Sequence, residues 1–449
     1  MSTATLDTGP ATGASTVPGP APPRRPAGRL VPVLVCGGAL LTLAVGLLAK
    51  LAGLDWGAPA QPLVVFLRPA LSTWGIPGAT VLAACLYVAR RLLVAPVRPL
   101  GFAGAAFALT LITRVAVNVF RGGPGALDRP FVVGLHGEGR TEYLPGLRFL
   151  DAGVGHFLSH FPDLVPTLPI QASGHPPGLL LTLHYLGIDT AAGAAALTIL
   201  VGALATPLLY LLGRELAEDR EARAAALLFV FVPTSLLYGA TSGDAVFATL
   251  GVLAAAGLLA RPASVRILGA AALALATFFS YALLAVGIWS ALVRWRRRGF
   301  AAALRLGMLC AAVLVVVFLA LDLATGFDLL AAIRATDSHY REGIARLRPY
   351  LFWLFGSPAA FLLLLGPVAW FAARSLAARE ATAVALAVVI AISALAGYTK
   401  AETERIWLFL VPFACLAAAR SLTARRVPAV LAAATAQALL FEVFLFTKW

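Results

Sequence analysis

Acidic, basic and histidine side chains that could support bond-breaking chemistry are concentrated in one polar segment, between Phe120 and Pro176. This segment contains the carboxylates of Asp128 and Glu142 and four of the six histidines of the chain, and it ends in His175-Pro-Pro-Gly. A positioned carboxylate can serve as a general base. Because long loops of compact proteins are usually functional, this segment is the first candidate for a site.

Three shorter polar segments add further candidates. The first is the Ser242-Gly243-Asp244 turn, the second spans 325–350 and the third spans 399–405. Arginine and lysine suit an anionic ligand such as a lipid-linked phosphate, although solvated charges paired with neighbouring acids would give the same pattern. The candidate side chains in these segments are Asp244, His339, Tyr340, Arg341, Arg348, Lys400, Glu404 and Arg405.

The rest of the chain is strongly apolar. Hydrophobic residues make up 60% of the 449 residues and charged residues 12%, and the mean hydropathy is +0.88. These values exclude an ordinary soluble protein, and apolar runs long enough to cross a bilayer recur along the chain. We expect an all-α polytopic membrane protein with about 11–13 transmembrane helices and a long first extracytoplasmic loop that bears juxtamembrane helices.

One membrane domain accounts for most of the predicted organisation. Residues 1–29 have the composition of a disordered cytoplasmic tail, residues 30–98 contain two transmembrane helices, and residues 99–449 contain the others together with extracytoplasmic loop 121–175. Residues 267–293 are expected to form a hairpin of two short helices, and residues 176–188 a short re-entrant or slanted helix. The expected spans are 30–51, 76–94, 99–120, 190–213, 224–240, 243–260, 304–324, 351–373, 381–398, 405–419 and 428–447.

Basic residues between the spans predict the orientation in the cell membrane. The positive-inside rule explains the net charge of +14, so nucleic acid is not an expected partner. Keeping every basic cluster cytoplasmic places the four polar segments together on the extracytoplasmic side. The clusters are Arg24/Arg25/Arg29, Arg90/Arg91/Arg98, Arg214/Arg220/Arg223, Arg261/Arg266, Arg294/Arg296/Arg297/Arg298, Arg374/Arg379 and Arg420/Arg425/Arg426.

Arg114 is a charged residue inside the predicted span 99–120. A charge at the centre of a membrane helix costs about 2.5–3.5 kcal/mol on insertion scales. We expect Arg114 either to extend its side chain to the outer interface or to pair with a carboxylate such as Asp128 at a substrate site.

The sequence contains no pattern of metal ligands. The four cysteines all lie in apolar segments, where they are expected to be small core residues. His136, His156 and His160 lack the spacing of a zinc site. We therefore expect no metal centre and no bound cofactor, and a requirement for a free divalent metal is left open.

The order of these motifs resembles the GT-C superfamily of integral membrane glycosyltransferases, and is similar to its family 39-like and actinobacterial members. The resemblance covers most of the chain from about residue 99 and implies a GT-C-like helical bundle. The similar segments are Thr141-Glu142-Tyr143-Leu144, Gly174-His175-Pro176-Pro177-Gly178, the turn from Tyr238 to Asp244, and Lys400-Ala-Glu-Thr-Glu-Arg-Ile-Trp407.

The resemblance implies transfer of a sugar from a polyprenyl-phosphate donor to a glycan, lipid or protein acceptor of the cell envelope. A carboxylate would be the general base, and cationic side chains would stabilise the leaving lipid phosphate. Glu142 is the preferred base and Asp128 the second, because the usual acidic pair is a single glutamate here. The substrate-binding candidates are Arg114, Tyr143, His175, Asp244, His339, Tyr340, Arg341, Arg348, Lys400, Glu404 and Arg405.

Two other functions fit the same sequence. One is a transporter or flippase of a lipid-linked or small polar substrate, which should have paired inverted halves and polar residues at the bilayer midplane. The polar residues here are predicted at one face, and no halves are evident, which favours the enzyme. The other is a catalytically inactive accessory membrane protein, since the acidic motif is reduced to Glu142.

Overall fold

The computed structural model describes residues 28–134 and 138–447. Its described part is almost entirely helical, with one sheet of two short antiparallel strands. The elements are α1 (Leu30–Leu51), β1 (Phe66–Leu67), α2 (Gly75–Val94), α3 (Pro99–Gly122), α4 (Val154–Ser159), α5 (Phe161–Leu164), α6 (Ile170–Ser173), α7 (Gly178–Tyr185), α8 (Ala191–Ala203), α9 (Ala205–Leu216), α10 (Asp219–Phe231), α11 (Pro233–Tyr238), α12 (Gly243–Leu259), α13 (Ala263–Phe279), α14 (Leu284–Arg298), α15 (Phe300–Thr325), α16 (Leu329–Glu342), α17 (Tyr350–Leu365), α18 (Pro367–Ala377), α19 (Ala381–Ala396), α20 (Thr403–Ile406), α21 (Val411–Ser421), α22 (Val427–Phe444) and β2 (Leu445–Phe446).

Within the described residues, six segments are long and apolar enough to cross a membrane: α1, α2, α3, the pair α8–α9, α15 and α22. The bent pair α17–α18 is a seventh candidate, and α12, α13 and α19 are shorter apolar helices. The predicted fold class, an all-α multi-pass membrane protein, agrees with this arrangement. The predicted total of about 11–13 crossings requires the shorter and broken helices to be counted as well.

Two local predictions for short helices are confirmed. Residues 267–293 form the predicted hairpin: α13 ends at Phe279, Ser280 is extended, and α14 begins after one 3-10 turn. The predicted short helix over 176–188 is α7, and its eight residues are too few to cross a bilayer.

Two predicted spans are not single continuous helices, because each is interrupted just before a proline. Residues 351–373 form α17 and α18, which meet at 113°, because Gly366 has a positive φ of 55° and Pro367 begins the next helix. Residues 224–240 form α10 and α11, interrupted where Val232 is extended before Pro233.

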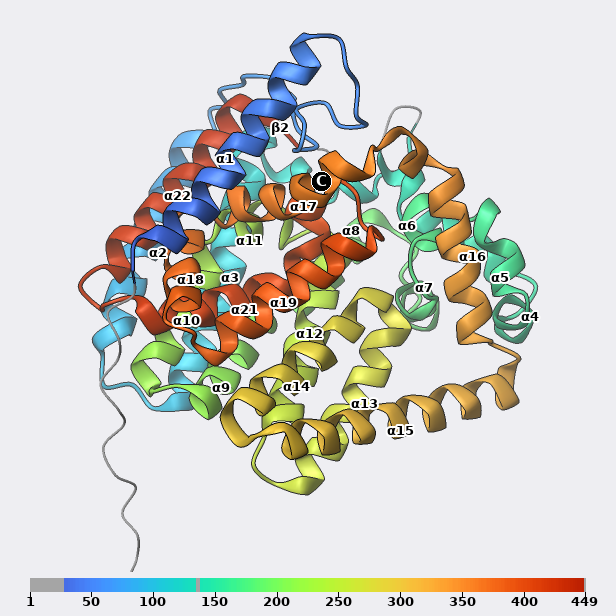
Figure 1. The fold of residues 1–449 in the computed structure, drawn as a ribbon. Coiled ribbons are helices and arrows are strands. Elements are labelled where there is room, and N and C mark those ends of the chain that lie inside the picture. The colour runs from blue at the N-terminus through green and yellow to red at the C-terminus, as the bar shows by residue number, and fades with distance from the viewer. Residues whose placement is uncertain (1–27, 135–137, 448–449) are drawn as a thin grey trace, which may run out of the picture.

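The basic turns gather at one end of the bundle, toward the lower left of Figure 1. Arg223 of α10 donates hydrogen bonds to three carbonyls in and beside the turn between α2 and α3. Arg420, near the end of α21, forms ion pairs with Glu221 of α10 and with Glu380 before α19. These contacts place the basic turns side by side, as expected if they share one side of the membrane.

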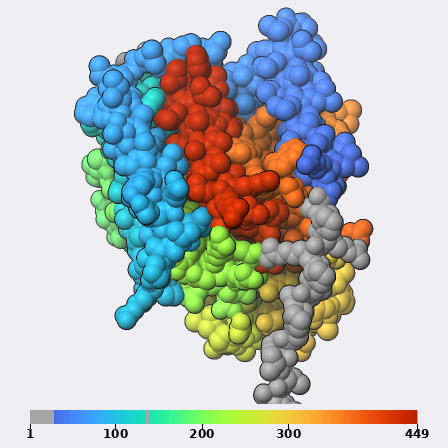
Figure 2. Space-filling model, turned by 90° about the vertical axis from the view of Figure 1, so that its left-hand side faces the viewer, coloured from blue at the N-terminus to red at the C-terminus, as the bar shows by residue number. Residues whose placement is uncertain are grey.

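The polar segments gather at the other end. The short helices α4 and α5 of the long loop lie beside α16 at the right of Figure 1. Segment 52–74, which connects α1 to α2, also lies at this end, where β1 pairs with β2 and Phe66 is opposite Phe446. Figure 2 shows α22 running between α2–α3 on one side and α1 on the other. Strand β2, near the end of the described chain, therefore holds segment 52–74, which lies near its start, by backbone pairing.

Candidate functional site

The centre of the candidate site is the buried guanidinium of Arg405, from the short helix α20. Its Nη1 lies 2.7 Å from Oδ2 of Asp244 at the start of α12, and its Nη2 lies 3.1 Å from Oε2 of Glu402. Although burial opposes its charge, the carboxylates of Asp244, Glu402 and Glu142 raise the pKa of Arg405. Arg405 therefore stays charged and joins segments that are far apart in sequence.

Arg348 extends this ion-pair network toward α17. Its Nη2 lies 3.2 Å from Oε1 of Glu402, its Nη1 donates to the carbonyl of Lys400, and its Nε donates to the carbonyl of Gly57 at 3.4 Å. Burial opposes the charge of Glu402, but Arg405 and Arg348 hold the pKa of this carboxyl below its usual value. Glu402 is thus a carboxylate shared by two arginines.

The backbone of segment 399–405 is strained at two consecutive residues. Ala401 and Glu402 have φ values of 68° and 61°, a region that costs a non-glycine residue of order 1–3 kcal/mol. Tyr340 of α16 helps to hold the loop, because its Oη accepts a hydrogen bond from the amide of Lys400 at 2.8 Å. Such strain persists only where the surroundings fix it, and it clusters at functional sites.

Glu142, the predicted base, is buried beside this network. It follows the 3-10 helix Glu138–Thr141, and it is only 2% exposed. Its carboxylate is one of the three charges that act on Arg405. The structure therefore brings two predicted site residues, Glu142 and Asp244, to the same cation.

Tyr143 and His175 lie next to the network against α12. Their rings are stacked with centroids 6.4 Å apart, and the His175 ring packs on Phe247 at 4.8 Å. Glycine at 243 permits this approach, since a Cβ there would lie 3.2 Å from the ring of Tyr143. Burial and the nearby Arg405 lower the pKa of His175 to about 3, so its imidazole is neutral near pH 7.

The hydroxyl of Tyr143 is a buried polar group at this site that lacks a hydrogen-bond partner among the described residues. The residue is 2% exposed, and its Oη has no hydrogen-bond partner among the residues that the structure describes. Burial raises the pKa of Tyr143 well above its usual value, so it remains a hydroxyl that can donate. A buried polar group without a partner costs free energy, which a polar ligand would recover.

Lys400 differs from the neighbouring arginines in having no carboxylate partner in the described part of the chain. Its Nζ donates to the carbonyls of Arg348 at 3.2 Å and Ala345 at 3.5 Å. Burial, with the charges of Arg341 and Arg348, lowers its pKa. Arg341, by contrast, pairs with Asp337 at 2.8 Å on the surface of α16. Of the predicted cationic residues near this site, Lys400 is therefore the one best able to bind an anionic ligand.

Two predicted residues lie outside the network. Asp128 precedes the 3-10 helix Arg129–Phe131, and its carboxylate forms no hydrogen bond or ion pair within the described ranges. His339 lies on α16, partly exposed, and its ring likewise has no polar contact there. The choice of Glu142 ahead of Asp128 as base is consistent with these positions.

Both expectations for how Arg114 is accommodated were wrong. The side chain is fully buried rather than extended to the interface, and no described carboxylate pairs with it. Instead its Nη2 lies 3.0 Å from Oγ of Ser235, and its guanidinium packs on the ring of Phe229. This face of α3 packs against α9 and α11 rather than lipid. Arg114 therefore supports the end of α11, just before the turn that carries Asp244.

Sequence reasoning missed segment 52–74, which covers the network. Oε1 of Glu404 accepts a hydrogen bond from the amide of Val64 at 2.7 Å, and the indole of Trp353 donates to the carbonyl of Trp56 at 2.9 Å. On the side of segment 52–74 these contacts are made by backbone groups, which every residue has, so no sequence motif indicates them. The one available signal is a connection longer than most helix–helix turns.

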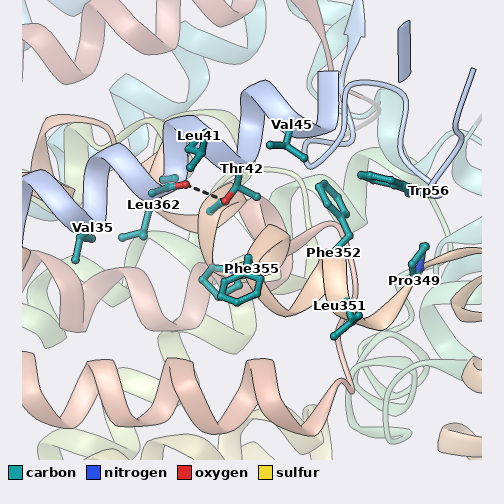
Figure 3. A pocket seen from close by; sticks show the side chains of 14 residues that line it. Val35, Leu41, Thr42, Val45, Trp56, Pro349, Leu351, Phe352, Phe355 and Leu362 are labelled. Carbon is teal, nitrogen blue, oxygen red and sulfur yellow. Dashed lines mark hydrogen bonds between the residues drawn. The ribbon is translucent and has the colours of Figure 1, made fainter. Parts of the chain in front are cut away.

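An apolar groove of about 730 Å³ runs between α1 and α17. Figure 3 shows it extending from Val35 and Leu362 at one end to Trp56 and Pro349 at the other. Because Pro349 directly follows Arg348, the groove ends beside the cationic part of the site. Its lining suits a hydrocarbon chain.

Among the residues described by the structure, no group of three or more histidine, cysteine, aspartate or glutamate side chains is arranged to hold a metal ion. No family model, curated protein or solved structure matches the chain. Its interpretation therefore rests on the residues themselves, and the resemblance to GT-C enzymes stays a prediction.

Replacing Glu404 by glutamine should remove a pH dependence of stability. Burial raises the pKa of this carboxyl from 4.5 to about 7. The protonated carboxyl stabilises the fold fully below pH 4.5, and this contribution is lost as the pH rises through about 7. Relative to wild type, Glu404→Gln should therefore gain up to about 3 kcal/mol of stability over this range.

The measurement is the melting temperature of both proteins in detergent at a series of pH values. Glu342→Gln, which changes an exposed carboxylate of α16, is the control. Parallel curves for wild type and Glu404→Gln would show that Glu404 does not titrate in this way.

Proposed function

We propose that this chain is a GT-C-like glycosyltransferase, which moves a sugar from a polyprenyl-phosphate donor to a cell-envelope acceptor on the extracytoplasmic side. The observation that carries the proposal is the order of three features. An apolar groove of about 730 Å³ ends at Pro349, and Lys400 lies next to it with Nζ 3.2 Å from the carbonyl of Arg348. From Arg348 the ion pairs lead through Glu402 to Arg405, on which the buried carboxylate of Glu142 acts. This order matches the tail, the phosphate and the reacting sugar of such a donor.

Lys400 is the group proposed to bind the donor phosphate. Arg405 and Arg348 share Glu402, and Arg405 also pairs with Asp244, so their charges are largely compensated. We therefore give these arginines a structural role, holding segment 399–405 in its strained conformation. Within the described residues the ammonium of Lys400 contacts carbonyls and no carboxylate, so its charge is not compensated by an acid and is available to a phosphate.

The reaction needs one proton transfer and one displacement. The acceptor hydroxyl loses its proton to the carboxylate of Glu142 while its oxygen attacks the anomeric carbon of the donor sugar. The bond between that carbon and the phosphate oxygen breaks, and the prenyl phosphate leaves with the electron pair. Lys400 stabilises the negative charge that develops on the phosphate. The hydroxyl of Tyr143, which has no hydrogen-bond partner among the described residues, and the neutral ring of His175 bind the sugar.

Glu142→Gln tests the function and the base together. The amide keeps the shape of the side chain but cannot accept the proton, so the transfer rate should fall by about 10²–10⁴-fold. Transfer is measured in proteoliposomes with polyprenyl-phosphate arabinose, mannose and galactose as donors. Asp163→Asn, an exposed carboxylate of the same loop, is the control and should keep the wild-type rate. A folded Glu142→Gln protein at wild-type rate would contradict the base, and a wild type that uses none of the donors would contradict the function.

Gly38→Leu tests the groove as the site of the donor tail. A Cβ at Gly38 or at Gly37 would meet no atom within 4 Å, but only Gly38 lines the groove. Filling the groove should raise KM for a long-chain donor about tenfold, since about two buried methylenes account for that factor, and should leave kcat nearly unchanged. Gly37→Leu is the control: it introduces the same side chain in α1 at a position that does not line the groove, and it should leave KM unchanged. Equal KM values in the two variants would exclude the groove.

A further inference from the structure

Three arginines converge on one aromatic ring at the edge of the described site. The guanidinium carbons of Arg68, Arg121 and Arg129 each lie 5.4 Å from the ring centroid of Phe446 in β2. Arg68 follows β1, Arg121 is in the last turn of α3, and Arg129 begins a 3-10 helix of the long loop. The fold thus collects like charges from three separate segments, and their mutual repulsion opposes this arrangement.

The charges of this cluster are poorly compensated. Arg121 donates to the backbone carbonyls of Glu442, Leu445 and Arg68, so its side chain is fixed by the fold. The guanidinium groups of Arg68 and Arg129 form no hydrogen bond or ion pair in the described part of the chain, and both residues are exposed. Glu442 is the carboxylate that acts on Arg121. Within the described residues, the three arginines and Glu442 therefore leave a net positive site, in which Arg68 and Arg129 have unused donors.

A small polar cavity lies beside two of these side chains, Arg121 and Arg129. It has a volume of about 70 Å³ and is lined by Asn118, Arg121, Arg129 and Glu442, among others. This is room for roughly five water-sized spheres, as many as the heavy atoms of a phosphate group. Arginine forks match the geometry of phosphate oxygens, and two unused forks point to such a ligand.

The surroundings favour a lipid over a soluble anion. The cluster lies at the ends of α3 and α22, two of the helices long enough to cross a membrane. The adjoining segment exposes Leu67 (75%), Leu71 (90%) and Ile76 (78%), with Trp74 between them. Exposed aliphatic residues with a tryptophan are typical of the membrane interface, where lipid headgroups lie.

We propose that Arg68, Arg121 and Arg129 bind the phosphate group of an anionic membrane phospholipid. The headgroup offsets the repulsion between the arginines, and the acyl chains cover the exposed residues of segment 67–76. The bound phosphate also links Arg68, beside β1, to Arg121 and Arg129, which strengthens the pairing of β1 with β2. Because β1 follows closely on Val64, the partner of Glu404, the lipid fixes the segment that covers the Arg405 network. This inference does not depend on the proposed transferase activity.

The test measures lipid binding by the full-length protein in detergent with native mass spectrometry. Phosphatidylglycerol is the anionic probe and phosphatidylcholine the zwitterionic one. In Arg68→Gln/Arg129→Gln the affinity for the first bound phosphatidylglycerol should fall at least about tenfold, because two charge-assisted contacts are lost. Arg298→Gln/Arg425→Gln removes two exposed arginines from the opposite end and should leave that affinity unchanged. The backbone-bonded Arg121 is kept in both variants.

Melting temperatures without lipid show whether each variant is folded, and Arg129→Gln alone, which leaves β1 untouched, should give a smaller loss in the same direction. Equal binding of the two lipids by wild type would contradict the proposal, as would unchanged affinity in a folded Arg68→Gln/Arg129→Gln protein. Complete displacement of phosphatidylglycerol by millimolar inorganic phosphate would assign the site to a soluble anion instead.

Discussion

The ion pairs of Arg405 with Asp244 and Glu402 are the contacts on which the polar end of the molecule depends. Arg405 is 4% exposed, so its charge has little access to water. Removing one partner of a buried ion pair costs roughly 3–5 kcal/mol, because the other charge is left uncompensated. The start of α12 and segment 399–405 must therefore assemble together, and Glu142 is held beside the same cation.

Other features of the site follow from this constraint. Glu402 can remain in a left-handed conformation because both Arg405 and Arg348 bind its carboxylate. Arg348 then orients the chain entering α17, which forms one wall of the apolar groove. The position of the groove relative to the buried carboxylates is thus set by one shared network. Strain and burial of this kind are expected where geometry must be maintained for a ligand.

Hydropathy and local turn signals in the sequence predicted the helices and the polar ends well. They did not predict which way a side chain points or which residues far apart in sequence pair with each other. The first three helices, the hairpin broken at Ser280 and the location of Glu142 and Asp244 at the same end of the molecule were all predictable, because hydropathy and short polar turns report on them. Hydropathy does not show which way a side chain points, so the burial of Arg114 against Ser235 was not foreseen. Segment 52–74 acts through backbone groups, which no motif records. The pairing that neutralises Arg405 depends on residues far apart in sequence, so it also required the structure.

A double-mutant cycle on Asp244 and Arg405 tests most directly whether this buried pair organises the site. The free energy of unfolding would be measured in mixed micelles for wild type, Asp244→Asn, Arg405→Gln and the double variant. Each single change should lower the free energy of unfolding by roughly 3–5 kcal/mol. The loss in the double variant should be smaller than the sum of the two single losses by about 2 kcal/mol or more, since the two groups act as one unit. Single costs that simply add would contradict the account, because they would mean that Arg405 and Asp244 stabilise the protein independently.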